Sequence, residues 1–133
     1  PVLLRLKSDL VSHCMAALNN SLNREKVEWE TRKSLGVVMA SGGYPGNYSN
    51  NHPILGLEDI SSNYGHKIFH GGTKFADNRL VTNGGRVLCV TALGDSLEDA
   101  KTSAYELVSK ISWENVQYRT DIGWRAIEKN RKN

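Results

Sequence analysis

The sequence predicts an α+β protein with a small curved or barrel-like sheet, and three observations support this class. The first is an amphipathic segment whose leucines recur at three- and four-residue steps between Leu3 and Leu18. The second is a series of short apolar runs between residues 35 and 94, separated by turns rich in glycine and asparagine. The third is one further amphipathic helix after those runs, because strands and helices segregated along a chain are typical of α+β domains.

Composition is that of an ordinary globular domain. The chain has 133 residues, of which 39% are hydrophobic, and its formal net charge is +3. No dense basic stripe with interleaved aromatics appears, so we expect no nucleic-acid partner. No apolar run approaches the ~20 residues needed to span a bilayer and no signal peptide opens the chain, so we expect no membrane and a cytoplasmic location. Cys14 and Cys89 lie in apolar patterns without metal-binding spacing, which favours buried, reduced thiols.

The first half of the chain is expected to hold one helix and two strands. The helix begins at Pro1, which suits a first turn, and ends at residues 19–20, which are both asparagine. Residues 26–30 alternate polar and apolar side chains, a pattern that predicts a short half-exposed strand. Residues 35–40 form an apolar run that ends in a glycine-rich loop at 41–46, which predicts a buried strand followed by a loop.

A hairpin around Asn83-Gly84-Gly85 is the central prediction. After a loop at residues 48–64 and a strand at 67–70, apolar runs at 80–82 and 86–94 flank this turn sequence, which reaches positive φ at low cost. The run after the turn is apolar on both faces, so we expect a strand that is buried on both sides. Asp77-Asn78 predicts another turn just before it.

The last part of the chain predicts a capped helix and an irregular end. Ser96 and Asp99 have the spacing of a capping box, and apolar residues recur at helical steps between 97 and 111. Residues 116–126 predict a short strand and a turn. There, Tyr118 and Trp124 are interpreted as core anchors, and Asp121 with Arg125, four apart, as a structural salt bridge.

Three glycine-rich loops on apolar strands are the candidate binding elements. At residues 83–86, backbone N–H groups and the Arg86 guanidinium suit a phosphate or carboxylate, while a plain hairpin turn with a surface arginine explains the same residues. The loop at 41–46 lacks the Gly-Lys-Ser/Thr ending of a phosphate-binding P-loop, which favours a structural turn or a mobile flap. At 70–74, His70 or Lys74 is available to an anion, although a lone histidine at a strand end is more often structural.

These residues describe part of a site, without a complete set of catalytic groups. The four histidines, at positions 13, 52, 66 and 70, have no metal-binding spacing with acids. The sequence indicates no pair of a nucleophile and its general base, and no Gly-x-Ser-x-Gly motif is present. We therefore expect no catalytic residue and no metal ligand in this chain.

Five motifs give the chain its resemblance to a known family. The motifs are Ala40-Ser41-Gly42-Gly43-Tyr44-Pro45-Gly46, Phe69-His70-Gly71-Gly72-Thr73-Lys74, Val81-Thr82-Asn83-Gly84-Gly85-Arg86-Val87-Leu88, Thr91-Ala92-Leu93-Gly94 and Tyr118-Arg119-Thr120-Asp121-Ile122-Gly123-Trp124-Arg125. Their order and spacing closely resemble the C-terminal part of phosphoribosylamine–glycine ligase (glycinamide ribonucleotide synthetase) over nearly the whole sequence. Residues 1–9 resemble the helix that follows the Gly-Asp-Pro-Glu signature in the ATP-grasp domain of this family.

The resemblance implies a fold, a reaction and partners. It implies that residues 1–24 are the terminal helix of an ATP-grasp domain and that residues 25–133 are a barrel-like C-terminal domain forming a wall of the substrate site. The implied enzyme uses ATP to join glycine to 5-phosphoribosylamine in purine biosynthesis, through a glycyl phosphate. ATP and Mg²⁺ would be bound mainly by residues upstream of Pro1, so the fragment alone is expected to be inactive. Its implied partners are the upstream ATP-grasp and N-terminal domains of the same enzyme.

With the resemblance, the turn at residues 83–86 is favoured as substrate-facing. The alternative is a structural or interaction module that covers the ATP-grasp body without touching substrate, and a third interpretation is a stand-alone anion- or nucleotide-binding module. The candidate substrate-binding residues are Asn83, Gly84, Gly85, Arg86, Gly42, Gly43, Tyr44, His70 and Lys74.

Overall fold

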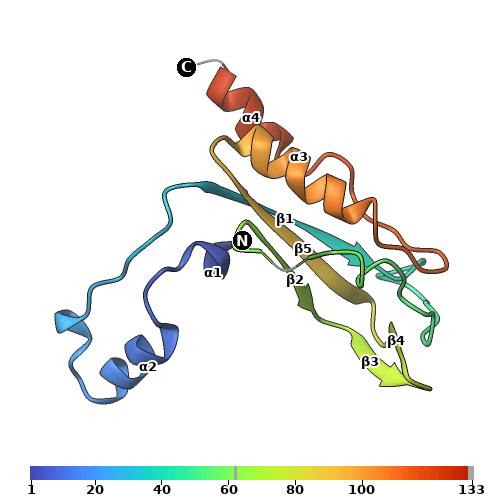
Figure 1. Cartoon of the computed structure of the whole chain (residues 1–133), viewed down its shortest axis with the longest axis horizontal. Helices are drawn as coiled ribbons and strands as arrows, with labels where there is room; N and C mark the ends of the chain where they lie inside the picture. The colour runs from blue at the N-terminus through green and yellow to red at the C-terminus, as the bar shows by residue number, and fades with distance from the viewer. Residues whose placement is uncertain (62, 132–133) are drawn as a thin grey trace.

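A computed structural model describes residues 1–61 and 63–131 of the chain (Figure 1). The strands are grouped between an N-terminal helical segment and two C-terminal helices, whereas the short strand predicted within residues 116–126 is reduced to an isolated bridge at Gln117. The elements are α1 (Val2–Arg5), α2 (Leu10–Leu18), a short 3-10 helix η1 (Leu22–Arg24), β1 (Lys33–Ala40), β2 (His66–His70), β3 (Thr73–Ala76), β4 (Arg79–Thr82), β5 (Arg86–Gly94), α3 (Leu97–Val108) and α4 (Trp124–Arg131).

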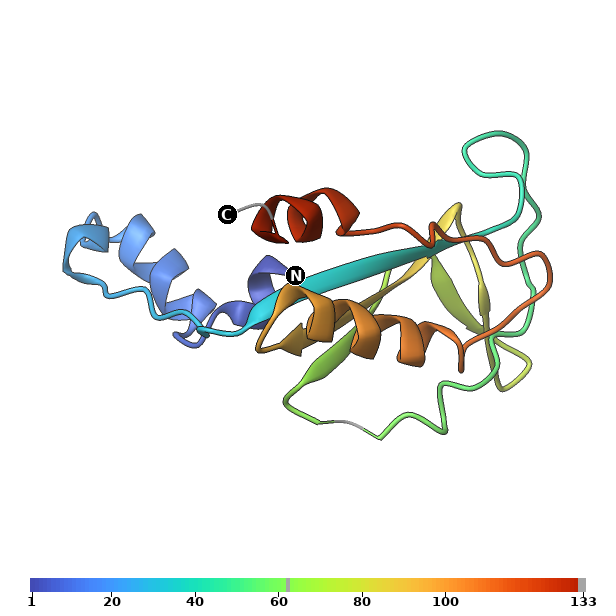
Figure 2. The same cartoon turned by 90° about the horizontal axis from the view of Figure 1, so that it is seen from above.

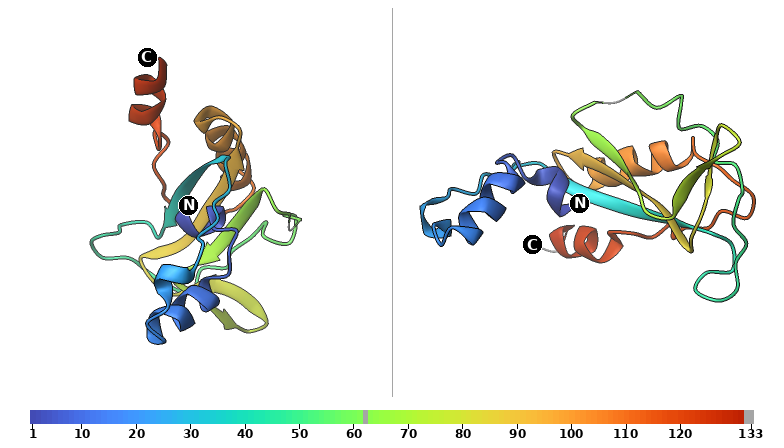
Figure 3. Two further views of the ribbon diagram at one scale, coloured as in Figure 1. Left: turned by 90° about the vertical axis from the view of Figure 1, so that its left-hand side faces the viewer. Right: turned by 90° about the horizontal axis from the view of Figure 1, so that it is seen from below.

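An antiparallel sheet with the strand order β1-β5-β2 supports the core. The central strand β5 is buried at most of its positions, as its two-sided apolar pattern predicts. Helix α3 packs on one face of this sheet, and its capping box between Ser96 and Asp99 is present as predicted. Helices α3 and α1 lie on opposite sides of the sheet (Figures 1 and 3). The core between sheet and helix includes Leu35, Val37, Met39, Leu88, Val90, Ala92, Ala100, Ala104, Leu107 and Val108.

The predicted hairpin across residues 83–85 is wrong. Strand β4 pairs with β3 in a separate two-stranded sheet, while β5 pairs with β1 and β2. The hairpin turn lies instead at Asp77 and Asn78, whose φ angles of 48° and 57° are both positive, as a tight two-residue hairpin turn requires. The chain therefore passes from one sheet to the other at residues 83–85.

The α+β class is confirmed, whereas a closed barrel is not observed. Within the part of the chain that the structure describes, the strands form a three-stranded and a two-stranded sheet. Residues 51–54 extend the smaller sheet, because Asn51 N and Ile54 N donate hydrogen bonds to the carbonyls of Thr82 and Leu80. The described strands thus form two small sheets, with α3 on one face of the larger, rather than a closed ring.

The predicted continuous N-terminal helix is wrong, because it breaks between α1 and α2. Lys7 N donates to Glu28 O (2.9 Å) and Glu30 N donates to Arg5 O (2.6 Å), so residues 5–8 pair with 28–30 instead of continuing the helix. Asp9 then caps α2 by accepting a hydrogen bond from Val11 N. The strand predicted at 26–30 is reduced to an isolated bridge between Leu6 and Trp29.

Residues 1–32, which we call the N-terminal arm, begin against the sheet at Pro1 and α1. From α2 onward the arm projects away from the sheet and α3 (Figures 1 and 2). The apolar side chains of α2 are largely exposed: Val11 is 67% exposed and Leu18 76%. Cys14 is also exposed, which corrects the prediction of two buried thiols, whereas Cys89 is half-buried; both cysteines are free.

The two residues interpreted as core anchors of the C-terminal segment are exposed. Tyr118 and Trp124 keep 38% and 41% of their surface accessible. Ile127 of α4 is buried instead, close to Leu35, and the positive φ of Gly123 (83°) turns the chain into this helix.

Candidate functional site

The face of the three-stranded sheet opposite α3 is largely open. In β1, Leu35, Val37 and Met39 point into the core, so the alternating residues point the other way. On this open face Val38 lies beside Cys89, and Cys89 lies beside Phe69. Val38 is 44% exposed and Phe69 37% exposed, so an apolar surface is available for contact.

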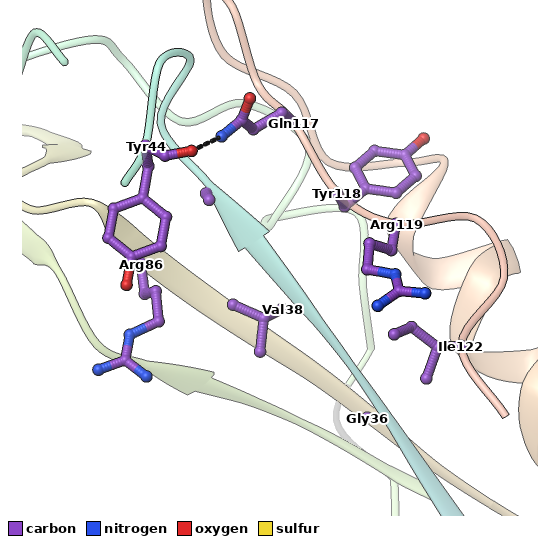
Figure 4. Close-up of a pocket in the computed structure, with 9 residues that line it drawn as sticks. Gly36, Val38, Tyr44, Arg86, Gln117, Tyr118, Arg119 and Ile122 are labelled. Carbon is purple, nitrogen blue, oxygen red and sulfur yellow. Dashed lines mark hydrogen bonds between the residues drawn. The ribbon is translucent and has the colours of Figure 1, made fainter. Parts of the chain in front are cut away.

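Two adjacent cavities on this open face share lining residues, and we call the pair the sheet-face groove. The larger has a volume of about 490 Å³ and lies between β1, the loop that carries Tyr44 and the segment at residues 117–122 (Figure 4). The smaller, of about 190 Å³, lies over Phe69, Cys89 and neighbouring residues. Val38 and Arg86 line both cavities.

Arg86 is the charged group at the junction of the two cavities. It is the first residue of β5, its side chain is exposed, and its guanidinium makes no hydrogen bond or ion pair with any described residue. Its neighbours in the groove include the apolar Val38 and Val87. An unpaired guanidinium over an apolar floor is suited to bind an anionic group by charge-assisted hydrogen bonds.

The turn at residues 83–85 positions the loop that carries Tyr44. Ser41 N donates to Gly85 O (2.8 Å) and Ser41 Oγ donates to Gly84 O (2.8 Å), so the two segments are joined by both backbone and side chain. A Cβ at position 85 would lie 2.1 Å from Tyr44 Cδ2. Glycine at this position therefore allows the Tyr44 ring to pack against the backbone and to form one wall of the groove.

The opposite wall is the segment at residues 117–122, and it is joined to the first wall. Gln117 and Ala40 exchange two backbone hydrogen bonds, of 2.8 and 2.9 Å. The Gln117 side-chain amide donates to the carbonyl of Tyr44 at 2.7 Å, as Figure 4 shows. The positions of the two walls are thus coupled.

Arg119 is fixed on this wall by an ion pair with Asp121. Its Nε and Nη2 donate to the two carboxylate oxygens at 2.8 and 2.6 Å. The hydrogen bond from Arg119 lowers the pKa of Asp121 below its usual value, and the carboxylate raises the pKa of Arg119. The predicted partner of Asp121 was Arg125, which lies instead over the ring of Trp124.

Tyr105 of α3 fixes the backbone of the same segment. Its hydroxyl donates to the carbonyl of Arg119 and accepts a hydrogen bond from Ile122 N. The helix therefore sets where residues 119–122 lie.

The structure brings together three of the nine predicted site residues. Tyr44, Arg86 and His70 line the groove. The glycines at 42, 43, 84 and 85 shape the backbone: Gly43 has a φ of 92°, and a Cβ at Gly42 would lie 2.6 Å from Asn115. Asn83 and Lys74 line neither cavity. Substrate contact by any of the nine stays a prediction.

Among the groove residues that sequence reasoning did not select, Gln117, Tyr118 and Arg119 have polar side-chain groups. They follow an irregular segment, where no periodicity indicates which side chain faces inward. The Tyr118–Arg125 motif could have indicated them, because it has more aromatic and charged residues than a connecting segment requires.

The described residues, 1–61 and 63–131, contain neither a metal site nor a helix that could span a membrane. In residues 1–61 and 63–131, no group of three or more His, Cys, Asp or Glu side chains is arranged to hold a metal ion. The helices of this part of the chain are all too short or too polar to cross a bilayer.

Comparison with known proteins identifies the family. The family model for "Phosphoribosylglycinamide synthetase, C domain" matches residues 34–125. The chain belongs to the phosphoribosylglycinamide synthetase C-domain family. The matched residues include every residue that lines the sheet-face groove, from Gly36 to Ile122.

Curated relatives and a solved structure agree with membership of this C-domain family. The chain is 53% identical over 132 residues to a phosphoribosylamine–glycine ligase of Escherichia coli (strain K12), with 97% of the chain covered, and 51% identical to that of Pseudomonas syringae pv. tomato, with 98% covered. It spans only 30% of the length of these relatives. The crystal structure of phosphoribosylamine–glycine ligase from Thermotoga maritima matches 81% of this chain and 27% of its own, with a TM-score of 0.63 and 32% identity.

Proposed function

We propose that this chain is the C-terminal portion of an ATP-dependent cytoplasmic ligase that joins glycine to 5-phosphoribosylamine, and that its sheet-face groove forms one wall of the substrate site. Support comes from the family match and from the relatives, which are named for this activity. In this proposal the upstream part of the enzyme binds ATP and Mg²⁺, and the groove contributes binding and positioning groups.

The observation that carries the proposal is the contact between the first residue of the N-terminal arm and the groove. Gly36 lines the larger cavity, and a Cβ built on it would lie 2.9 Å from Pro1 Cγ. Ser34 Oγ also donates to the carbonyl of Pro1 (3.0 Å). In the resembled family the magnesium-binding acidic and amide residues lie upstream of the segment that matches Pro1. A polypeptide that continues upstream of Pro1 would therefore start beside the groove, on the side where the proposal places the substrate.

The chemistry of the reaction explains why such a wall is needed. An acyl phosphate hydrolyses in water, so the site must be enclosed while glycine is activated. In this proposal the apolar floor around Val38 and the two linked walls form one side of the enclosure, which the upstream domains complete. Arg86 supplies a positive charge for an anionic part of the substrate.

The test is Arg86→Ala in the intact ligase. Loss of a charge-assisted hydrogen bond of about 1.5–3 kcal/mol predicts a rise in KM for 5-phosphoribosylamine of roughly 10- to 100-fold, with little change in thermal stability. Arg79→Ala, an exposed arginine at the start of β4 that lies outside the groove, is the matched control. Unchanged steady-state kinetics of the Arg86 variant would remove the residue from the site.

The alternative, an interaction module without substrate contact, is favoured by one observation, the exposed apolar surface of the N-terminal arm. We propose that residues 1–24 belong to the ATP-grasp domain and that this surface is covered there. Under the alternative alone, Arg86→Ala would change domain docking or the melting temperature and leave the substrate parameters unchanged.

A further inference from the structure

We propose that the sheet-face groove binds a sugar phosphate in one orientation, with the phosphate on Arg86 and the sugar hydroxyls on Arg119. This inference rests on the proposed function and goes beyond it, because it assigns separate roles to the two arginines of the groove. It follows from how each guanidinium is paired, from the position of the two groups and from the surfaces between them.

Arg86 keeps its full charge for a ligand. No described residue pairs with its guanidinium, so the group carries five available N–H donors. A planar, unpaired guanidinium matches the geometry of a phosphate, to which it can donate two parallel hydrogen bonds. The anionic end of a ligand is therefore expected at Arg86.

Arg119 offers donors without a net charge. Asp121 neutralises the guanidinium and occupies its Nε and one hydrogen of Nη2. Three of its five N–H groups remain for other acceptors. Because a second anion near this ion pair would also face the Asp121 carboxylate, uncharged acceptors such as hydroxyl oxygens are the better partners.

The two groups are placed for a ligand with two different ends. In Figure 4 the guanidinium groups of Arg86 and Arg119 lie on opposite sides of Val38, which forms the floor between them. The phenol rings of Tyr44 and Tyr118 belong to the two walls, and such rings provide apolar faces for the C–H groups of a sugar ring. The cavity volume of about 490 Å³ lies within the range of small-molecule sites.

Asp121 is a positioning residue in this arrangement. Its carboxylate is absent from the lining of the groove, so it acts by holding Arg119, while Tyr105 holds the backbone on both sides of it. Removing Asp121 is therefore expected to weaken recognition of the hydroxyls and to leave recognition of the phosphate intact.

The experiment compares two probes on the intact ligase, with ADP filling the nucleotide site. Ribose 5-phosphate carries the phosphate and the hydroxyls, whereas tetrahydrofurfuryl phosphate has the same ring and phosphate without ring hydroxyls. Calorimetric Kd values give an affinity ratio for the two probes. We expect the wild-type enzyme to bind ribose 5-phosphate roughly 2- to 10-fold more tightly, which is the contribution of about one neutral hydrogen bond.

The variants at the two ends of the groove have different expected results. Arg119→Ala and Asp121→Asn bring the ratio close to one by weakening ribose 5-phosphate alone. Arg86→Ala weakens both probes at least about tenfold and keeps the ratio. Asp59→Asn, an exposed aspartate distant in sequence from both walls, is the control for loss of one carboxylate and changes neither value.

The outcomes separate this inference from the proposed function. If Arg86→Ala weakens both probes while Arg119→Ala and Asp121→Asn keep the wild-type ratio, the assignment of Arg119 is wrong and the substrate wall stands. If Arg119→Ala weakens both probes and Arg86→Ala removes the ratio, the orientation is reversed and the inference is wrong. If none of the three variants changes either affinity, the proposed function fails as well.

Discussion

At the scale of single residues, the partners of a side chain decide its role more than its type does. Arg86 and Arg119 line the same cavity, but one is unpaired and the other is bound to Asp121. The sequence indicated Arg86 as a candidate binding residue because it follows a recognisable glycine-rich turn. The place of Arg119 in the groove was not predicted. Its pairing with Asp121, two positions away, depends on an irregular backbone that no sequence pattern indicates.

Glu30 holds the beginning and the end of the N-terminal arm together. Its carboxylate accepts hydrogen bonds from Arg32 Nη2 (2.9 Å) and Thr31 N (3.0 Å), and its backbone carbonyl accepts two from Arg5 (3.0 and 3.2 Å). The side-chain hydrogen bond from Arg32 is the main reason that the pKa of Glu30 falls from 4.5 to about 2. The ionised form is thus stabilised in the folded chain.

This predicts a defined dependence of stability on pH. Because the folded-state pKa of Glu30 is depressed, its contribution to the free energy of unfolding is complete above pH 4.5 and is lost as the pH falls toward about 2. Chemical unfolding of the wild type and Glu30→Gln between pH 6 and pH 2 measures this. The stability difference should be largest at pH 6 and should shrink below pH 4.5. Glu106→Gln, an exposed position of α3, is the charge-matched control, and a difference for Glu30→Gln that stays constant down to pH 2 contradicts the prediction.

At the scale of elements, the sequence predicted the helix and strand with regular patterns correctly, but it did not show which of two turn sequences forms the hairpin. Helix α3 and strand β5 were predicted because the apolar positions and the capping box act locally. Both Asp77-Asn78 and Asn83-Gly84-Gly85 have hairpin-forming sequences, and both flank β4. Pairing of β4 with β3 leaves the second turn to connect two sheets. That choice depends on non-local contacts such as Asn83 N with Gly72 O (2.8 Å), which a single sequence does not reveal.

The packing of that second turn against the Tyr44 loop yields a prediction for Gly85→Ala. The added methyl group would lie within 2.6 Å of two ring atoms of Tyr44, so the ring must move. Overpacking of this kind costs about 1–3 kcal/mol, which urea unfolding of the chain would measure. A crystal structure of the variant should show the ring displaced and the groove wall shifted. Gly65→Ala, whose nearest contact would be Asn63 Oδ1 at 3.2 Å, is the control; wild-type stability with an unmoved Tyr44 would contradict the prediction.

At the scale of the whole molecule, the chain consists of a packed body and a projecting arm. The body has its own core between α3 and the three-stranded sheet, whereas the arm buries Ala16 among the residues of α2. The sequence predicted the amphipathic character of the arm correctly, but it could not show that the apolar stripe faces away from the body. Periodicity identifies an apolar face without identifying what that face contacts.

The exposed stripe predicts different proteolysis of the chain alone and of the intact ligase. Residues 22–27, between α2 and β1, are largely exposed, and the Lys26 side chain is 86% exposed. Trypsin is therefore expected to cut the isolated chain first after Arg24 or Lys26. Mass spectrometry should then detect a resistant body that begins at Glu25 or Val27, with Lys101 in α3 still uncut. If the upstream domains cover the arm, the same bonds in the intact ligase should be cut at least about tenfold more slowly, because cleavage would then require local opening of that interface. Equal rates in the two proteins would mean that the apolar stripe of α2 has no cover, and residues 1–24 would then not belong to the ATP-grasp domain.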